Sequence, residues 1–98
     1  MGLNRMPNGI TRPKLIHSVE AEFSDEARRR RIEGTVLVSF TVSEQGLPID
    51  MRIVKSVGYG LDEQALLAVN QYRFEPALQD GKPVPAPVSV EVRFRFAH

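Results

Sequence analysis

The stretch TVLVSFTVSEQGLPIDMRI, residues 35–53, decides the fold. Apolar β-branched or aromatic residues occupy every second position from 36 to 42, which is typical of a strand with one face on a core. Residues 43–46 end in a glycine and predict a turn, and apolar side chains alternate again from 49 to 53. Because about four or five residues separate the two strands, we expect an antiparallel hairpin.

The segment VSVEVRFRF, residues 88–96, has the strictest alternation in the chain and predicts the last strand. Before it, apolar residues recur at helical spacing from Leu61 to Tyr72, with Asp62 and Glu63 in the first turn, where the helix dipole favours acids. A helix at this place carries the chain over one face of the sheet. The last strand can therefore enter the same sheet beside the first.

A second helix is predicted over residues 25–33, because Ser24 can cap its first turn and Gly34 follows its last. A short extended piece at 14–19 could precede it, with Leu15 and Val19 toward the core. Together these elements predict an α+β fold. We expect a three-stranded antiparallel sheet with two helices packed on one face, in the order α-β-β-α-β.

The length of 98 residues corresponds to one domain. Residues 1–13 have no periodicity and several turn residues, so we expect a linker there and the domain over 14–98. Another turn is predicted at residues 80–83.

The composition excludes several classes of function. With 13 Lys+Arg and 12 Asp+Glu the net charge is +1, which predicts neither nucleic acid nor an anionic membrane as a partner. Cysteine is absent, which excludes disulfides and thiolate chemistry. No apolar run is long enough to predict a membrane span.

No catalytic, metal-binding or cofactor-binding residue is predicted. His17 and His98 have no partner at metal-ligand spacing. The pattern Gly58-Tyr59-Gly60 lacks both the third glycine of a dinucleotide loop and a phosphate-loop lysine. The arginines at 28–31 point in different directions on a helix, so a solvated helix face is favoured over a nucleic-acid site.

The last strand carries the one binding hypothesis that the pattern supports. It is long and contains neither glycine nor proline from 88 to 96, so an open edge there could accept a guest strand in a defined register. The alternative is a final strand that completes the sheet, with its edge protected by charge or by the N-terminal tail.

Seven short motifs, in order and at family spacing, resemble the C-terminal domain of the TonB family of Gram-negative energy transducers. The resemblance covers roughly residues 13–96. The motifs are Pro13-Lys14, VEAEFSDEAR at 19–28, IEGTV at 32–36, VKSVG at 54–58, LDEQA at 61–65, YRFEPA at 72–77 and GKPV at 81–84. Two positions depart from the family: Ser24 follows Phe23 where a proline is usual, and Tyr72 stands where tryptophan is more frequent.

The resemblance implies a periplasmic domain of a protein anchored in the inner membrane, working with ExbB and ExbD through an N-terminal anchor. The domain would bind the TonB box of an outer-membrane transporter by strand addition and so drive uptake that depends on the proton gradient. The resemblance and the edge together predict these partner-binding residues: Val88, Ser89, Val90, Glu91, Val92, Arg93 and Phe94 of the last strand, with Phe23 and Arg28 near the entering partner.

Two questions stay open at the level of sequence. A TonB-like or TolA-like domain of another envelope protein, for example one fused to a sensor peptidase, would carry the same pattern. We expect a monomer, although an open edge could also pair with a second copy.

Overall fold

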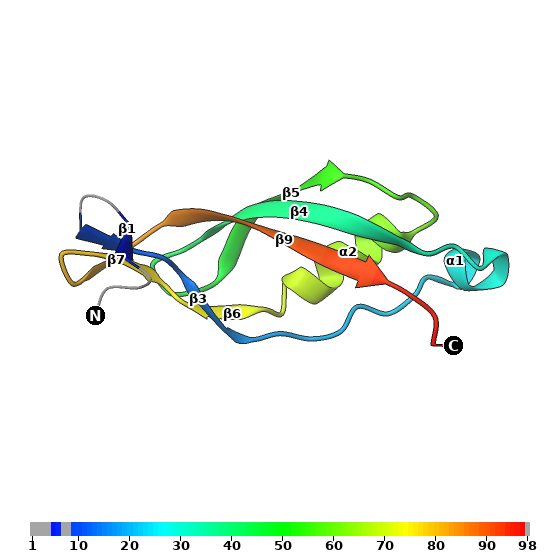
Figure 1. The fold of residues 1–98 in the computed structure, drawn as a ribbon, viewed down its shortest axis with the longest axis horizontal. Coiled ribbons are helices and arrows are strands. Elements are labelled where there is room, and N and C mark those ends of the chain that lie inside the picture. Colours follow the sequence, from blue (N-terminus) through cyan, green and yellow to red (C-terminus); the bar gives the residue numbers. More distant parts are fainter. Residues whose placement is uncertain (1–4, 7–8, 98) are drawn as a thin grey trace.

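The computed structural model describes residues 5–6 and 9–97. Its central sheet is three-stranded and antiparallel, in the order β5 (Pro48–Lys55), β4 (Gly34–Val42), β9 (Ala86–Phe94). Figure 1 shows the three strands side by side along the longest axis of the molecule. As predicted, β9 pairs with β4, the first strand of this sheet, over nine residues. Because β9 has no second neighbour in the sheet among the described residues, it forms one edge.

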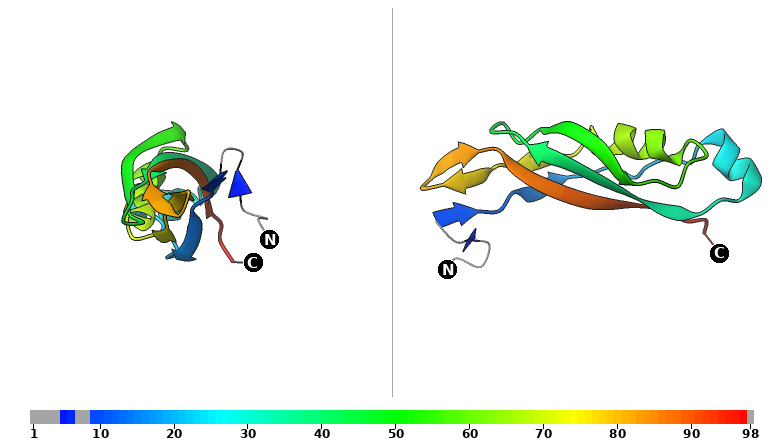
Figure 2. Two further views of the ribbon diagram at one scale, coloured as in Figure 1. Left: turned by 90° about the vertical axis from the view of Figure 1, so that its left-hand side faces the viewer. Right: turned by 90° about the horizontal axis from the view of Figure 1, so that it is seen from above.

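Two helices accompany the sheet. The helix α2 (Leu61–Val69) packs against β4 and β5 and buries four apolar residues: Leu61, Ala65, Ala68 and Val69. The helix α1 (Asp25–Arg30) lies at one end of the molecule, where it buries Ala27 (Figures 1 and 2). The predicted α+β class is confirmed.

The core follows the alternation seen in the sequence. On β4 the side chains of Val36, Val38, Phe40 and Val42 are all at most 3% exposed. From β9, Val92 and Phe94 meet them, and α2 covers the same face. Each such side chain contributes about 1.5–3 kcal/mol of hydrophobic stabilisation, so this face sets the register of the sheet.

Both helices are shorter than predicted. The first ends because Arg31 takes a left-handed conformation (φ 57°), and its N–H bonds back into the helix. Gly34 does not stop the helix; it begins β4, where a Cβ atom would lie 2.9 Å from Val57 Cγ2. The second helix ends at Val69, and the Tyr72 N–H then bonds to the Val69 carbonyl at 2.9 Å in a tighter turn.

Two small sheets were not predicted. The first has four strands in the order β1 (Arg5–Met6), β2 (Ile10–Thr11), β7 (Ala77–Gln79), β8 (Lys82–Val84). The second pairs β3 (Lys14–His17) with β6 (Arg73–Glu75).

Two of these strands, β1 and β2, lie inside the segment that was predicted to be a linker. They were not predicted because a strand of two residues is too short to show an alternating pattern. The domain boundary at residue 13 stays a prediction. Leu15 is 46% exposed, so its expected place in the core is wrong, whereas Val19 is half-buried.

The molecule is elongated, with extents of 50 × 26 × 19 Å. Figure 2 shows the β7–β8 hairpin at one end and α1 at the other. In the part of the chain that the structure describes, neither helix has the length and apolarity needed to cross a membrane.

Candidate functional site

The outer edge of β9 is the first element of the site. Within residues 5–6 and 9–97, β9 pairs with β4 and with no other strand. Its side chains alternate between the core and solvent, since Val92 and Phe94 are buried and Glu91 and Arg93 are exposed. A strand with these properties offers free backbone N–H and C=O groups at its edge.

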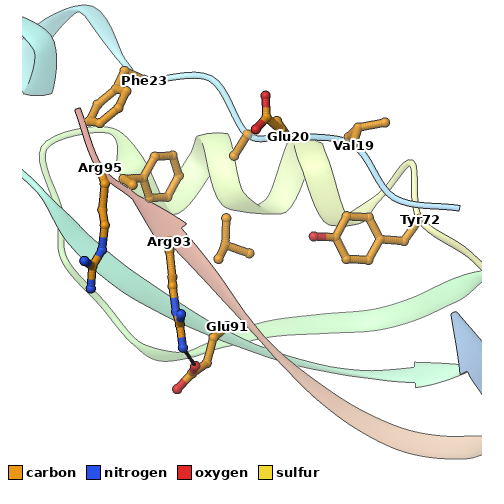
Figure 3. Close-up of a pocket in the computed structure, with 10 residues that line it drawn as sticks. Val19, Glu20, Phe23, Tyr72, Glu91, Arg93 and Arg95 are labelled. Atoms are coloured by element: carbon orange, nitrogen blue, oxygen red, sulfur yellow. Dashed lines mark hydrogen bonds and ion pairs between the residues drawn. The ribbon is translucent and has the colours of Figure 1, made fainter. Parts of the chain in front are cut away.

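A row of hollows runs along this edge. One of them, of about 420 Å³, lies between residues 91–95 and the extended segment 19–23 (Figure 3). A second lies between Leu15 and residues 89–91, and a third is lined by Arg12, Pro13 and residues 86–88. We call this row the edge groove; β9 with Arg95 forms one wall and residues 12–23 form the other.

The second wall includes backbone that is itself unpaired. Residues 18–23 are extended but belong to no strand, and no backbone–backbone hydrogen bond joins them to the rest of the described chain. The segment is held at its end by Ser24, whose hydroxyl accepts the Ala27 N–H at 3.1 Å and donates to the Tyr59 carbonyl at 2.5 Å. Both walls of the edge groove therefore include backbone without a backbone partner among the described residues.

Aromatic rings close one end of the edge groove. The Phe23 ring stacks on Phe96, with centroids 4.2 Å apart, and meets Phe94 edge-on at 5.6 Å. The Arg31 guanidinium lies 4.7 Å from the centre of the Phe96 ring, and Glu33 accepts the Phe96 N–H at 2.7 Å. These contacts fix the position of the second wall relative to β9.

Tyr72 lies where two hollows of the edge groove meet, and it lines both. Figure 3 shows its ring pointing into the space between β9 and the segment that carries Val19 and Glu20. Burial raises the pKa of Tyr72 above its ordinary value, so the hydroxyl stays neutral. It can both donate and accept a hydrogen bond.

Most of the predicted site residues come together in this groove. All seven residues from Val88 to Phe94 line it, and so does Phe23. Arg28 lies on α1, is exposed and lines none of these hollows. Whether these residues bind a partner stays a prediction.

Sequence reasoning missed Glu20, Tyr72 and Arg95, which also line the groove. In the sequence, Tyr72 is only the last residue of the apolar helical stripe and the position where the family more often has tryptophan. A possible signal was its position directly after a helix, where a large aromatic residue can reach the sheet edge. Arg95 continues the alternation of residues 88–96, which was a readable signal for its place beside Arg93. No local pattern marks Glu20, since its place depends on how the two walls meet.

In the described chain, the residue types that suggest metal or phosphate binding are not arranged for it. His17 is exposed on β3, and His98 lies outside the described residues. Among residues 5–6 and 9–97, no three His, Cys, Asp or Glu side chains gather as metal ligands would. The N–H groups of Val57 and Gly58, which a phosphate would need, bond to the Asp62 carboxylate at 3.0 and 3.2 Å.

Two of the four arginines at positions 28–31 make contacts within the molecule. Arg30 forms an ion pair with Glu26 at 3.4 Å and lies 6.0 Å from the centre of the Tyr59 ring. Arg31 caps α1 and covers Phe96. Arg30 and Arg31 therefore contact different parts of the molecule. This agrees with the prediction that the four arginines do not form a common stripe.

Known proteins resemble this chain over nearly all of its length. It is 33% identical over 97 residues to Protein TonB of Vibrio cholerae, covering 97% of this chain and 40% of that protein. It is 36% identical over 82 residues to Protein tonB2 of Pseudomonas aeruginosa, covering 83% and 30%. The chain thus spans less than half the length of these curated relatives.

The fold and a family model agree with these relatives. The solution NMR structure of the Pseudomonas aeruginosa TonB CTD matches with a TM-score of 0.71 and 28% identity over 88% of each chain. Residues 19–96, which include the whole β9 wall of the edge groove and residues 19–23 of the other wall, match the family model described as Gram-negative bacterial TonB protein C-terminal. The chain belongs to this family of TonB C-terminal domains.

Proposed function

We propose that this domain binds an extended peptide segment, the TonB box of an outer-membrane transporter, as an added strand on β9. The observation that carries the proposal is the edge groove, in which the unpaired edge of β9 faces an extended segment without backbone partners of its own. Strand addition needs such an edge, because backbone hydrogen bonds supply the affinity and flanking pockets supply the specificity.

The role proposed for the domain is binding and not catalysis. Its support is that the groove is lined by backbone, apolar side chains and charged side chains, among them Glu91, Arg93 and Arg95, and that no nucleophile and base converge there among the described residues. A module that docks through backbone pairing also needs no strong overall field, which agrees with a net charge of +1.

The rest of the proposal concerns the whole protein. Since this chain spans 40% of its Vibrio relative, further segments could carry an inner-membrane anchor that works with ExbB and ExbD. The domain would then lie in the periplasm and couple the proton gradient to uptake by the transporter. The upstream sequence tests this part, because an anchor helix is required.

Strand addition is tested by NMR on the ¹⁵N-labelled chain, titrated with a TonB-box peptide of a transporter from the same organism. We expect the amide signals of residues 88–94 to shift, together with those of 18–23 on the second wall. Shifts confined to residues 48–55 would place the guest at the other edge of the sheet and contradict the proposal.

Two matched control peptides make this test specific for backbone pairing. Each carries N-methyl groups at alternate residues, one at the odd and the other at the even positions. In an added strand, alternate N–H groups point to opposite sides, so one peptide loses its hydrogen bonds to β9 and binds much more weakly. If both bind as tightly as the unmodified peptide, strand addition is excluded.

A further inference from the structure

The exposed side chains of β9 form a charged row beside the edge groove. Ser89, Glu91 and Arg93 alternate with the core residues of the strand, and Arg95 continues the row just after it. Figure 3 shows Glu91, Arg93 and Arg95 extending from β9 away from the wall that carries Val19 and Glu20. The row therefore lies on the face of the sheet opposite to α2.

The residues of β4 that pair with Ser89, Glu91 and Arg93 carry no charge. In the β4–β9 register, Arg93 lies opposite Thr35, Glu91 opposite Leu37 and Ser89 opposite Ser39. A cross-strand partner for Arg93 can therefore come only from the open side of β9. Near Arg95, Glu33 lies just before β4, and its carboxylate accepts the Phe96 N–H at 2.7 Å.

The two arginines differ in how far they are already neutralised. Arg93 pairs with Glu91 of its own strand at 3.1 Å, with both side chains more than half exposed. Arg95 forms neither an ion pair nor a side-chain hydrogen bond with any residue in the described chain. Within the described chain, one cation without a partner and one weakly paired cation thus stand two residues apart at the end of β9.

The side of the groove that faces the core is lined mainly by apolar and aromatic side chains, with Glu20 on the segment opposite β9. Val88 and Val90 are half-buried against the core, Val92 is 5% exposed and Phe94 is 1% exposed. The rings of Tyr72 and Phe23 line the same space. A guest strand would direct alternate side chains into these surroundings and the others toward the charged row.

We infer that the occupant of the edge groove is an alternating segment with apolar side chains toward α2 and two acidic side chains, two residues apart, beside Arg93 and Arg95. This inference rests on the proposed strand addition. The spacing fits, because residues two apart on a guest strand have the same separation along the strand as Arg93 and Arg95. The arginines thereby select acidic over basic segments.

The expected difference in affinity between acidic and other segments can be estimated from what exposed cross-strand ion pairs contribute. Each such pair changes affinity by up to about fivefold, and salt reduces the effect because the row is open to solvent. The charge preference should therefore be clear at low ionic strength and shrink as salt is added.

Three capped ten-residue peptides test the inference. All carry valine at alternate positions and threonine between, except that two intervening positions, two residues apart, are both glutamate, both glutamine or both lysine. Dissociation constants come from the NMR titration of the 98-residue chain at low salt. We expect the glutamate peptide to bind about threefold or more tightly than the glutamine peptide, and the lysine peptide to bind more weakly than both.

A charge reversal and its matched control locate the effect. Arg95→Glu should lower the preference for glutamate over lysine by about fivefold. Arg52→Glu reverses an exposed arginine on β5, at the other edge of the sheet, and should leave the preference unchanged. An equal effect of the two substitutions would mean that overall charge, not the row on β9, is responsible, and would overturn the inference.

The outcomes separate the inference from the proposed function. If all three peptides shift the signals of 88–94 with equal affinity, strand addition stands and charge selection is wrong. If the lysine peptide binds most tightly, the inference is likewise overturned. If no peptide affects β9, both the inference and the strand addition on which it rests fail.

Discussion

Gly46 connects the β4–β5 hairpin to the rest of the molecule at a point where no side chain fits. Its φ is +82°, and an added Cβ atom would lie 2.0 Å from the Phe74 carbonyl oxygen. The Phe74 N–H also donates to the Gly46 carbonyl at 3.0 Å. The turn of the central hairpin is therefore bonded directly to β6.

We predict that Gly46→Ala lowers the free energy of unfolding by about 3 kcal/mol, since it adds a clash to the cost of a left-handed alanine. Gly81→Ala is the matched control, with φ +83° but open space around it, and should cost about 1 kcal/mol. Urea unfolding measures both. Equal losses would show that the contact with Phe74 is unimportant.

Asp62 holds the loop before α2 in place. Its carboxylate accepts hydrogen bonds from the Ser56 hydroxyl and from the N–H groups of Val57 and Gly58. Partial burial raises the pKa of Asp62, but these three hydrogen bonds outweigh that effect and leave the pKa below its ordinary value. The carboxylate therefore stabilises the fold in its charged form.

We predict that Asp62→Asn lowers the free energy of unfolding by about 1 kcal/mol near neutral pH. Because the folded pKa is depressed, the contribution of Asp62 is complete above about pH 4 and is lost as the pH falls through the folded pKa. The difference between the two proteins should shrink accordingly in urea unfolding on acidification. Glu63→Gln, which removes the neighbouring first-turn charge, should show a smaller loss; a difference for Asp62→Asn that persists in acid would contradict the assignment.

At the scale of elements, the four-stranded sheet ties the N-terminal part of the described chain to the β7–β8 hairpin. The pairing is short, with Ile10 opposite Gln79 and Thr11 opposite Leu78. The Thr11 hydroxyl adds a contact by accepting the Leu78 N–H at 3.0 Å. Such a small sheet opens locally at low cost unless side chains support it.

We predict that Thr11→Val, which keeps the shape but removes the hydroxyl, increases hydrogen exchange of the Leu78 amide by about five- to tenfold. Thr41→Val near the end of β4 is the control and should leave this amide unchanged. Exchange followed by NMR makes the measurement. An unchanged Leu78 rate in the Thr11 variant would show that backbone pairing alone protects the sheet.

Elements with a long period could be predicted from sequence, and short ones could not. The alternation of β4 and β9 spans nine residues each and encodes which face is buried, so their pairing and the edge position of β9 followed. β2 has two residues and pairs with a strand nearly seventy positions away, so its formation depends on tertiary contacts. Asp80-Gly81, with φ of 52° and 83°, is a dipeptide typical of a two-residue β-hairpin turn, so the β7–β8 hairpin could have been predicted where only a turn was expected.

Of the two walls of the edge groove, one could be predicted from the sequence and the other could not. The wall formed by β9 follows from strand order and alternation. The opposite wall takes its place from the bond of Ser24 to the Tyr59 carbonyl and from the stack of Phe23 on Phe96, both of which join distant parts of the chain. No local sequence pattern encodes such contacts.

At the scale of the whole molecule, the shape departs from that of a compact globule. The radius of gyration is 15.3 Å, whereas a compact chain of this length has about 13 Å. Small-angle scattering at dilution should therefore give a value near the larger figure for a monomer. A value near the smaller figure would contradict the extended arrangement, and a rise with concentration would indicate pairing of two copies through an open edge.

The direction of β9 has a mechanical consequence. The strand lies along the longest axis of the molecule (Figure 1), so a strand added to it would lie along that axis too. Tension applied along this axis loads all the hydrogen bonds of the added strand together, in shear. Tension across it opens them one at a time, as a zipper opens. The attachment would therefore be strong under a lengthwise pull and weak under a sideways one, without any change in its equilibrium affinity.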